Sequence, residues 1–330
     1  MRSLKDVDQG RIVVSKRWTG LGDCLLSLLA AWRFARTTGR TLIADWRFSG
    51  YVSHYRNNAF SMIFDPPSLW GGVPFFGDDR VNNLVPMGPC YPSSWNIGTL
   101  HRRPRRADAD VLFDREAALN LILNGDDVAA PVVVFDGCLN DAIPSRAECR
   151  RLLGKLQLQA PIASAVETFV AEYLSNQPVI AMHVRHGNGG SYGHAHFWHN
   201  PGEALCRIVA VTTRVIRSLK VATGTDPILF LCTDNLAVEN NLRSAFPGIV
   251  TRPKKFRQIG EGELHSGSRA YTVRDDTVIE MLLLARSDIL IKFPPGSFFS
   301  FWGEIMKGPS PVSDRGYRKP ASTYLGPAVC

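Results

Sequence analysis

The segment from His183 to Gly190 has the composition of a loop that holds a phosphate group. Arg185 comes directly after the apolar run 179–184, so a rigid strand would hold its guanidinium, which can bind two phosphate oxygens at once. The glycines at 187, 189 and 190 would let the backbone approach a ligand closely. An ion pair between Arg185 and a nearby carboxylate is the alternative interpretation.

The turn Gly20-Leu21-Gly22 is a second candidate for anion binding, because it precedes a predicted helix whose N-terminal N–H groups favour an anion. It resembles half of a dinucleotide-binding fingerprint. Position 25, where the third glycine of that fingerprint would stand, is Leu. A simple turn, with Asp23 capping the helix, is the alternative.

Five of the eight histidines lie between residues 183 and 199, which raises the question of a metal site. His194, His196 and His199 are closely spaced, but no Asp, Glu or Cys follows before Glu203. We therefore expect no bound metal. The neighbouring aromatic residues instead favour stacking against sugar rings, with a purely structural loop as the alternative; they are Tyr192, Phe197 and Trp198.

The formal net charge of +8 is compatible with nucleic acid, an acidic membrane surface or a small anionic substrate. The basic run 102–106 is one short cluster without interleaved aromatic residues, so we expect no nucleic-acid partner. Asp108-Ala109-Asp110 fits the D-x-D motif of metal-dependent glycosyltransferases. It lies in a charged stretch rather than at a strand end, and we interpret it as solvated surface.

The N-terminal ten residues lack the apolar stretch of a secretory signal. The longest apolar run, 24–32, is about half of the ~20 residues that a membrane span needs. We expect a cytoplasmic protein without a transmembrane segment. The seven cysteines are scattered and none has C-x-x-C spacing, so we expect neither a disulfide framework nor a zinc site.

These residues need elements that hold them in place, and apolar runs alternate with helical patterns in two series. A chain of 330 residues fits two domains, and such alternation predicts α/β domains with parallel sheets. The expected domains are 1–175 and 176–330, both Rossmann-like. The expected strands are 11–16, 41–45, 132–137, 179–184, 227–233, 249–251 and 288–293. The expected helices are 24–38, about ten residues from Ser145, 202–221, 236–245, 274–287 and a last long one.

Ligands of open parallel sheets bind beyond the carboxyl ends of the strands. The residues that follow the expected strands therefore mark where a charged, hydroxyl-rich ligand would bind. They are Gly20, Gly22, Arg185, His186, Asn188, Asp234, Gly296 and Ser297.

The motif His183-Val-Arg-His-Gly-Asn188 resembles the H-x-R motif of inverting fucosyltransferases that make α-1,6, α-1,2 and O-linked fucose. Nearly the whole chain, from Trp18 onward, is similar to the rhizobial nodulation α-1,6-fucosyltransferases. These transfer fucose from GDP-fucose to the reducing-end N-acetylglucosamine of lipochitooligosaccharide Nod factors. The resemblance implies a GT-B architecture, with two Rossmann-like domains facing across a cleft, GDP-fucose as donor and no metal. It also implies an acceptor-side first domain and a GDP-fucose-binding second domain.

The resemblance also implies roles for single residues. His183 and Glu280 would contact guanine, and Arg185 would bind the β-phosphate. Glycines 20, 22 and 296, with Ser297, would line the diphosphate or ribose.

The sequence departs from the animal core fucosyltransferases at three positions. Their second motif arginine is His186 here, and their following aspartate is Asn188. Their proposed catalytic base, a glutamate, falls near His194. Arg185 and His194 are the expected catalytic residues, and His186 and Asn188 are expected near the nucleotide.

Two other function classes stay open at this point. The glycine turn is compatible with a nucleotide-dependent oxidoreductase, although its third glycine is missing. A non-catalytic nucleotide- or glycan-binding protein would contain the same loops.

Overall fold

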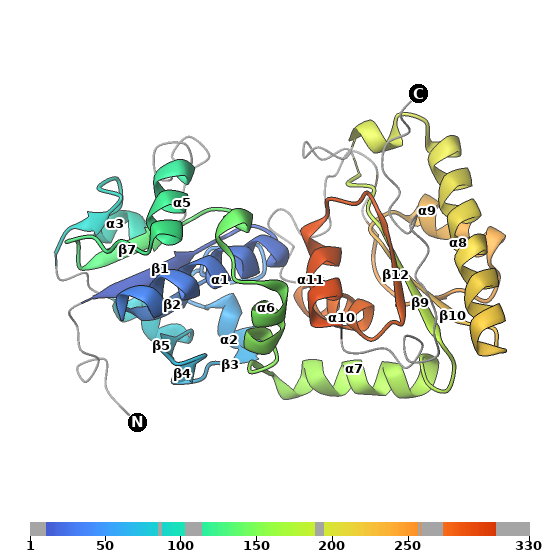
Figure 1. Cartoon of the computed structure of the whole chain (residues 1–330), viewed down its shortest axis with the longest axis horizontal. Coiled ribbons are helices and arrows are strands. Elements are labelled where there is room, and N and C mark those ends of the chain that lie inside the picture. Colours follow the sequence, from blue (N-terminus) through green and yellow to red (C-terminus); the bar gives the residue numbers. More distant parts are fainter. Residues whose placement is uncertain are drawn as a thin grey trace. The chain divides into compact units, whose positions relative to one another are not determined.

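The computed structural model describes residues 11–84, 88–102, 114–188, 195–256, 258 and 273–307. The described residues up to Gln159 form one compact unit, and those from Ala160 onward form a second. Helix α7 (Ala160–Tyr173) therefore belongs to the second unit. Each unit contains its own sheet with helices packed on it (Figure 1).

The first unit is built on a sheet in the order β4-β5-β2-β1-β7-β6. Its neighbouring strands are parallel except for the pair β4 and β5. The three central strands are buried along their whole length, as expected of apolar strands covered on both faces. The strands are β1 (Ile12–Lys16), β2 (Thr41–Asp45), β4 (Leu69–Trp70), β5 (Val73–Phe76), β6 (Cys90–Tyr91) and β7 (Val132–Phe135).

The remaining elements of the first unit are mostly short. Strands β3 (Phe64–Asp65) and β8 (Gln157–Leu158) form a separate antiparallel pair. The helices are α1 (Leu21–Thr38), α2 (Ala59–Ile63), α3 (Ile97–Leu100), α5 (Arg115–Asn124) and α6 (Arg146–Leu153), with 3-10 turns η2 (Asp79–Asn83) and η4 (Asn140–Ala142).

The second unit contains a fully parallel sheet in the order β11-β10-β9-β12. Helices α8 and α9 lie on one face, and α10 and α11 lie on the other (Figure 1). The strands are β9 (Val179–Val184), β10 (Ile228–Thr233), β11 (Val250–Thr251) and β12 (Ile289–Phe293). The helices are α8 (Pro201–Thr223), α9 (Leu236–Ala245), α10 (Arg274–Ala285) and α11 (Phe298–Met306), with the 3-10 turn η5 (Ala195–Trp198).

Local sequence explains where several helices begin and end. Asn200 precedes α8 and its side chain accepts a hydrogen bond from the Glu203 N–H, while Gly224 ends the helix in the left-handed conformation. Ser145 caps α6 in the same way, as its position before Glu148 predicts. Helix α1 begins three residues before the predicted start at Cys24, so Gly22 lies inside its first turn and not in a preceding loop.

Within the described ranges, no helix combines the length and the apolar character needed to cross a membrane.

Candidate active site

The strongest site candidate lies where the strand order of the second sheet reverses. Chain order runs from β9 outward to β10 and β11, and then returns to β12 on the other side of β9. Such a reversal leaves a crevice beyond the carboxyl ends of the two central strands, where α/β proteins bind ligands. Arg185 follows β9 at this point, and Pro294–Ser297 follows β12.

The backbone of Arg185 is held on both sides. Its N–H donates to the carbonyl of Phe293 at 2.7 Å, and its carbonyl accepts from the Trp198 indole Nε1 at 2.8 Å. The side chain is mostly buried, and its Nε lies 3.9 Å from Oδ2 of Asp234. A cation whose backbone is held in this way is suited to binding a phosphate, because it needs little reorganisation when the anion binds.

Asp234, the first residue after β10, fixes the loop that follows Arg185. Its two carboxylate oxygens accept from the backbone N–H groups of His186 at 2.7 Å and Gly187 at 2.9 Å. Gly187 and Asn188, with φ angles of 82° and 47°, have left-handed backbone directly after these two N–H groups. Asp234 was predicted from the sequence as a strand-end residue, without a role of its own. Its signal was a carboxylate directly after an apolar strand.

The side chain of Asn188 is fully buried and bonded within the same loop. Its Nδ2 donates to the Asp234 carbonyl at 2.7 Å, and its Oδ1 accepts from Asn235 Nδ2 at 2.8 Å. The His186 ring lies 4.9 Å from the Trp198 ring, and its Nδ1 accepts from the Asn188 N–H at 3.2 Å. The predicted residues Arg185, His186 and Asn188 are thus brought together at one strand end.

His183 lies in the middle of the sheet, in register with Cys232 on one side and Lys292 on the other. It is buried, and its ring packs 5.0 Å from the ring of Phe299 in α11. Lys292 forms an ion pair with Glu304 at 2.6 Å. His183 therefore points to the face of the sheet that α10 and α11 cover.

Glu280 lies on α10, on that same face, and forms an ion pair with Lys254. Burial raises the pKa of Glu280, and the Lys254 ammonium only partly opposes this rise. Burial alone would lower the pKa of Lys254, but Glu280, Cys232 and Glu239 together outweigh burial, so the pKa of Lys254 is raised. The Cys232 thiol also lies near the Glu280 carbonyl, at 3.9 Å.

Gly296 and Ser297 lead from β12 into α11. Gly296 is exposed, and Ser297 is the N-cap residue of the helix. The Ser297 side chain makes no capping hydrogen bond to α11, so its hydroxyl is not used to satisfy the helix terminus.

The first unit has the same kind of reversal, between β1 and β7. Arg17 follows β1 and Asp136 follows β7, and the two form an ion pair at 3.1 Å. Burial raises the pKa of Asp136, although Arg17 opposes that rise. Neither residue was predicted as a site residue, and the available signal was again a charged residue directly after an apolar strand.

The predicted glycine turn lies next to this ion pair. The N–H of Leu21, at the start of α1, donates to the hydroxyl of Tyr51 at 3.1 Å. The Asp23 carboxylate accepts from the Thr19 hydroxyl at 2.8 Å and lies 4.0 Å from Arg17. One backbone N–H at the N-terminus of α1 thus already has a hydrogen-bond acceptor within the protein.

Some predicted residues lie outside the described part of the chain. These are His194, the expected base, and the Asp108-Ala109-Asp110 motif. Among the side chains that are described, no three of His, Cys, Asp or Glu come together as metal ligands.

Comparison with known proteins gives consistent similarities over most of the chain. The model of the family "Nodulation protein Z (NodZ)" matches residues 9–315. Nodulation protein Z of Sinorhizobium fredii is 37% identical over 297 residues, which cover 89% of this chain and 90% of that protein.

Two solved structures are similar to this one, each with a TM-score of 0.72. The crystal structure of NodZ α-1,6-fucosyltransferase co-crystallised with GDP is 32% identical, and the alignment covers 89% of this chain and 91% of the other. The crystal structure of NodZ α-1,6-fucosyltransferase soaked with GDP-fucose is 31% identical, with coverage of 90% and 92%. The predicted GT-B fold class is confirmed by these similarities and by the parallel sheets of the two units.

Proposed function

The chain belongs to the nodulation protein Z family, and from that premise we propose that it transfers L-fucose from GDP-fucose to chitooligosaccharide Nod factors. The acceptor atom is the 6-hydroxyl oxygen of the reducing-end N-acetylglucosamine, and the product is the α-1,6-linked fucoside. The enzyme is inverting, acts in the cytoplasm and needs no metal ion.

The second unit binds GDP-fucose, and the first unit binds the acceptor. The observation that carries this assignment is Arg185, a rigidly mounted guanidinium at the strand-order reversal of the second sheet. The similarity to enzyme structures obtained with GDP and with GDP-fucose supports a nucleotide diphosphate as the anion. The first unit ends at Gln159, and the second begins with α7.

In the reaction, the bond between fucose C1 and the β-phosphate oxygen breaks while the acceptor oxygen attacks C1 from the opposite side. Negative charge grows on the β-phosphate as GDP leaves. Arg185 stabilises that charge, and loss of such a preorganised cation costs on the order of 3 kcal/mol in the barrier. The proton of the acceptor hydroxyl passes to a base, for which His194 is our candidate because its imidazole can accept a proton near neutral pH.

The other predicted residues have supporting roles around the nucleotide. His183 and Glu280 recognise guanine, and Gly296 and Ser297 line the diphosphate or ribose. The Ser297 hydroxyl suits this role because it does not cap α11. His186 and Asn188 shape the loop beside Arg185. Gly20 and Gly22 approach the diphosphate from the first unit.

The proposal is tested by incubating the protein with GDP-fucose and N-acetylchitopentaose and measuring the products by mass spectrometry. The expected product carries one added deoxyhexose on the reducing-end sugar, together with an equal amount of GDP. Binding of GDP without either product would indicate a non-catalytic nucleotide-binding protein. Quenching of NADH fluorescence, with no effect of GDP, would indicate an oxidoreductase.

A further inference from the structure

An exposed aromatic stack lies on the loop that follows β2. The side chain of Tyr55 is 55% exposed. The His54 ring stacks on it, with ring centres 4.6 Å apart and planes 29° apart, and Cζ of Arg56 lies 5.7 Å from the Tyr55 ring centre. We call these three residues the ring platform. They are exposed and consecutive, so the platform presents one cation and two rings to solvent.

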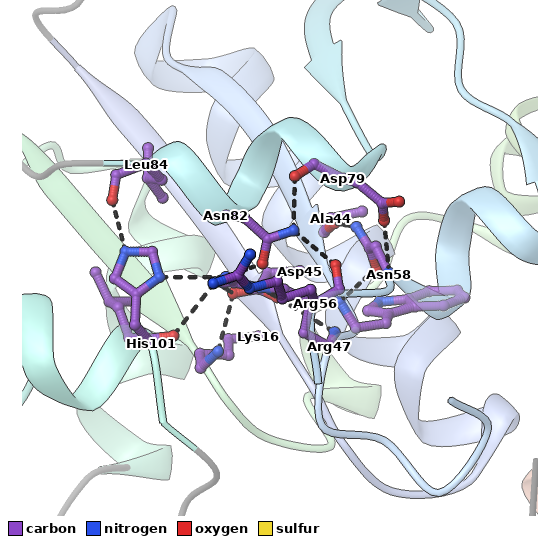
Figure 2. Close-up of polar contacts among 12 residues, drawn as sticks. Lys16, Ala44, Asp45, Arg47, Arg56, Asn58, Asp79, Asn82, Leu84 and His101 are labelled. Atoms are coloured by element: carbon purple, nitrogen blue, oxygen red, sulfur yellow. Dashed lines mark hydrogen bonds and ion pairs between the residues drawn. The ribbon is translucent and has the colours of Figure 1, made fainter. Parts of the chain in front are cut away.

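Asn82, at the end of η2, ties the ring platform to the interior of the first unit (Figure 2). Its Nδ2 donates to the carbonyl of Arg56 at 2.6 Å, and its Oδ1 accepts from Nη1 of Arg47 at 3.0 Å. The amide therefore connects the backbone of the platform to a guanidinium that is itself buried.

That guanidinium belongs to a buried ion cluster at the carboxyl ends of β1 and β2. Arg47 donates two hydrogen bonds of 2.8 Å to the Asp45 carboxylate, which also accepts from Lys16 at 2.9 Å. His101 lies 3.2 Å from Arg47 through Nδ1 and 2.6 Å from the Leu84 carbonyl through Nε2. Because a guanidinium only donates and a carbonyl only accepts, Nδ1 of His101 serves as the acceptor for Arg47 and Nε2 as the donor to Leu84.

The two ends of the loop are fixed as well. Asn58 accepts from the Trp46 N–H at 2.9 Å and donates to the carbonyls of Ala44 and Gly77 at 2.7 and 3.0 Å. Near the start of the loop, the Tyr51 hydroxyl accepts from the N–H of Leu21. The exposed rings thus stand on a loop that buried polar groups hold at its start, near its middle and at its end.

We propose that the ring platform binds a pyranose ring of the acceptor chain, on a sugar unit other than the one that receives fucose. This inference rests on the proposed function, which supplies the chitooligosaccharide. The C–H groups on one face of a pyranose pack against the electron-rich face of an aromatic ring. Arg56 and His54 can donate hydrogen bonds to ring hydroxyls and to the acetamido carbonyl.

The chemistry of the loop favours a sugar over a basic partner. Residues 51–57 include no Asp or Glu, so the platform offers no partner for a basic ligand. A neutral sugar bound to a preorganised surface loses little binding energy to ordering of the loop. Contact with one face of a sugar ring increases affinity for the acceptor. Other groups of the protein then position the hydroxyl that reacts.

The test compares Tyr55→Ala with Tyr55→Phe, using Tyr173→Ala as the matched control. Tyr173 is 43% exposed on α7 in the second unit, where its ring lies 4.8 Å from the Phe169 ring. Tyr55→Ala should raise KM for N-acetylchitopentaose by about three- to tenfold, the effect of one aromatic contact. KM for GDP-fucose should stay within about twofold, and N-acetylchitobiose should respond less than the pentaose. Tyr55→Phe should retain wild-type KM values because the ring remains.

If Tyr55 had only a structural role, Tyr55→Ala would raise KM for both substrates and lower the melting temperature. If the ring platform binds the acceptor, only KM for the long acceptor rises. Equal KM values for the pentaose in Tyr55→Ala and Tyr173→Ala would overturn the inference. Calorimetric titration with the pentaose alone separates this result from failure of the proposed function. If no fucose is transferred but Tyr55→Ala weakens pentaose binding, the proposed function is refuted and the proposed binding by the ring platform is supported. If fucose is transferred and pentaose binding does not change in Tyr55→Ala, the proposed binding by the ring platform is refuted.

Discussion

Replacing Asp234 by Asn tests whether a single carboxylate fixes the loop beside Arg185. The carboxylate accepts two backbone N–H groups, one on each oxygen, while an amide has one acceptor oxygen and an NH2 group. One N–H of the pair His186 and Gly187 would therefore lose its acceptor and face a donor. The bond from Asn188 to the backbone carbonyl of residue 234 does not involve the carboxylate, so the substitution isolates the carboxylate.

The size of the effect follows from these contacts. A hydrogen bond to a charged group contributes about 1.5–3 kcal/mol, so the local free energy of loop opening should fall by about that amount. If the displaced loop moves Arg185 so that the transition state loses the same amount of stabilisation, kcat falls by roughly 10- to 150-fold. The carboxylate charge, 3.9 Å from Nε of Arg185, disappears as well. KM for GDP-fucose should therefore rise less than kcat falls, because Arg185 keeps its attraction for phosphate.

The assay measures kcat and both KM values, together with hydrogen exchange at the amides of His186 and Gly187. Asp226→Asn is the matched control, since Asp226 precedes β10, is exposed and pairs with Lys220 at 2.8 Å. The control should keep wild-type kcat and exchange rates. Exchange at residues 186 and 187 that is unchanged in Asp234→Asn, with kcat within twofold of wild type, would refute the reasoning.

Three further predictions concern the same two sheets. Arg185→Lys should lower kcat by about tenfold or more at unchanged melting temperature, since an ammonium cannot bind two phosphate oxygens in one plane; wild-type kcat would exclude a bidentate role. Gly187→Ala should cost about 1–2 kcal/mol of stability in denaturant titrations, because its φ is 82° while no atom lies within 4 Å of an added Cβ. Burial would raise the pKa of Asp45, but Lys16 and Arg47 hold it at about 2. Because this folded-state pKa lies below the unfolded value near 4, the cluster stabilises the fold by ~2 kcal/mol above pH 4 and loses this as pH falls toward 2. Urea midpoints measured from pH 6 to pH 2 should show this loss in the wild type and not in Asp45→Asn.

The elements with strong periodicity could be predicted from the sequence. The strand at 179–184 and the helix at 236–245 were predicted with the bounds that the structure has, because an apolar run and an Asn cap mark them clearly. The placement of Arg185 at a strand end followed directly. Helix α7 was missed, although its apolar residues at 162, 166, 169, 170 and 173 follow helical spacing.

The contacts that orient the site could not be predicted in the same way. The two bonds to Asp234 join residues 48 and 47 positions apart, and one sequence does not reveal the left-handed backbone of residues 187 and 188 beside them. The contact of the Tyr51 hydroxyl with Leu21 joins residues 30 positions apart in a region without periodicity. Strand β5 has four residues and includes Pro74, so it lacks the usual pattern of a sheet strand.

The two strand-order reversals contain the same pair of residue types but differ in how the pair is used. In the first unit, Arg17 bonds directly to Asp136 at 3.1 Å, so the carboxylate neutralises the guanidinium. In the second unit, the oxygens of Asp234 accept backbone N–H groups, and the nearest one is 3.9 Å from Nε of Arg185. Asp136 therefore holds the side chain of Arg17, whereas Asp234 mainly holds the backbone of the loop that follows Arg185. A carboxylate that orders the loop beside an arginine, rather than the presence of an arginine at a strand end, is the feature on which we base the proposal that the second unit binds the donor.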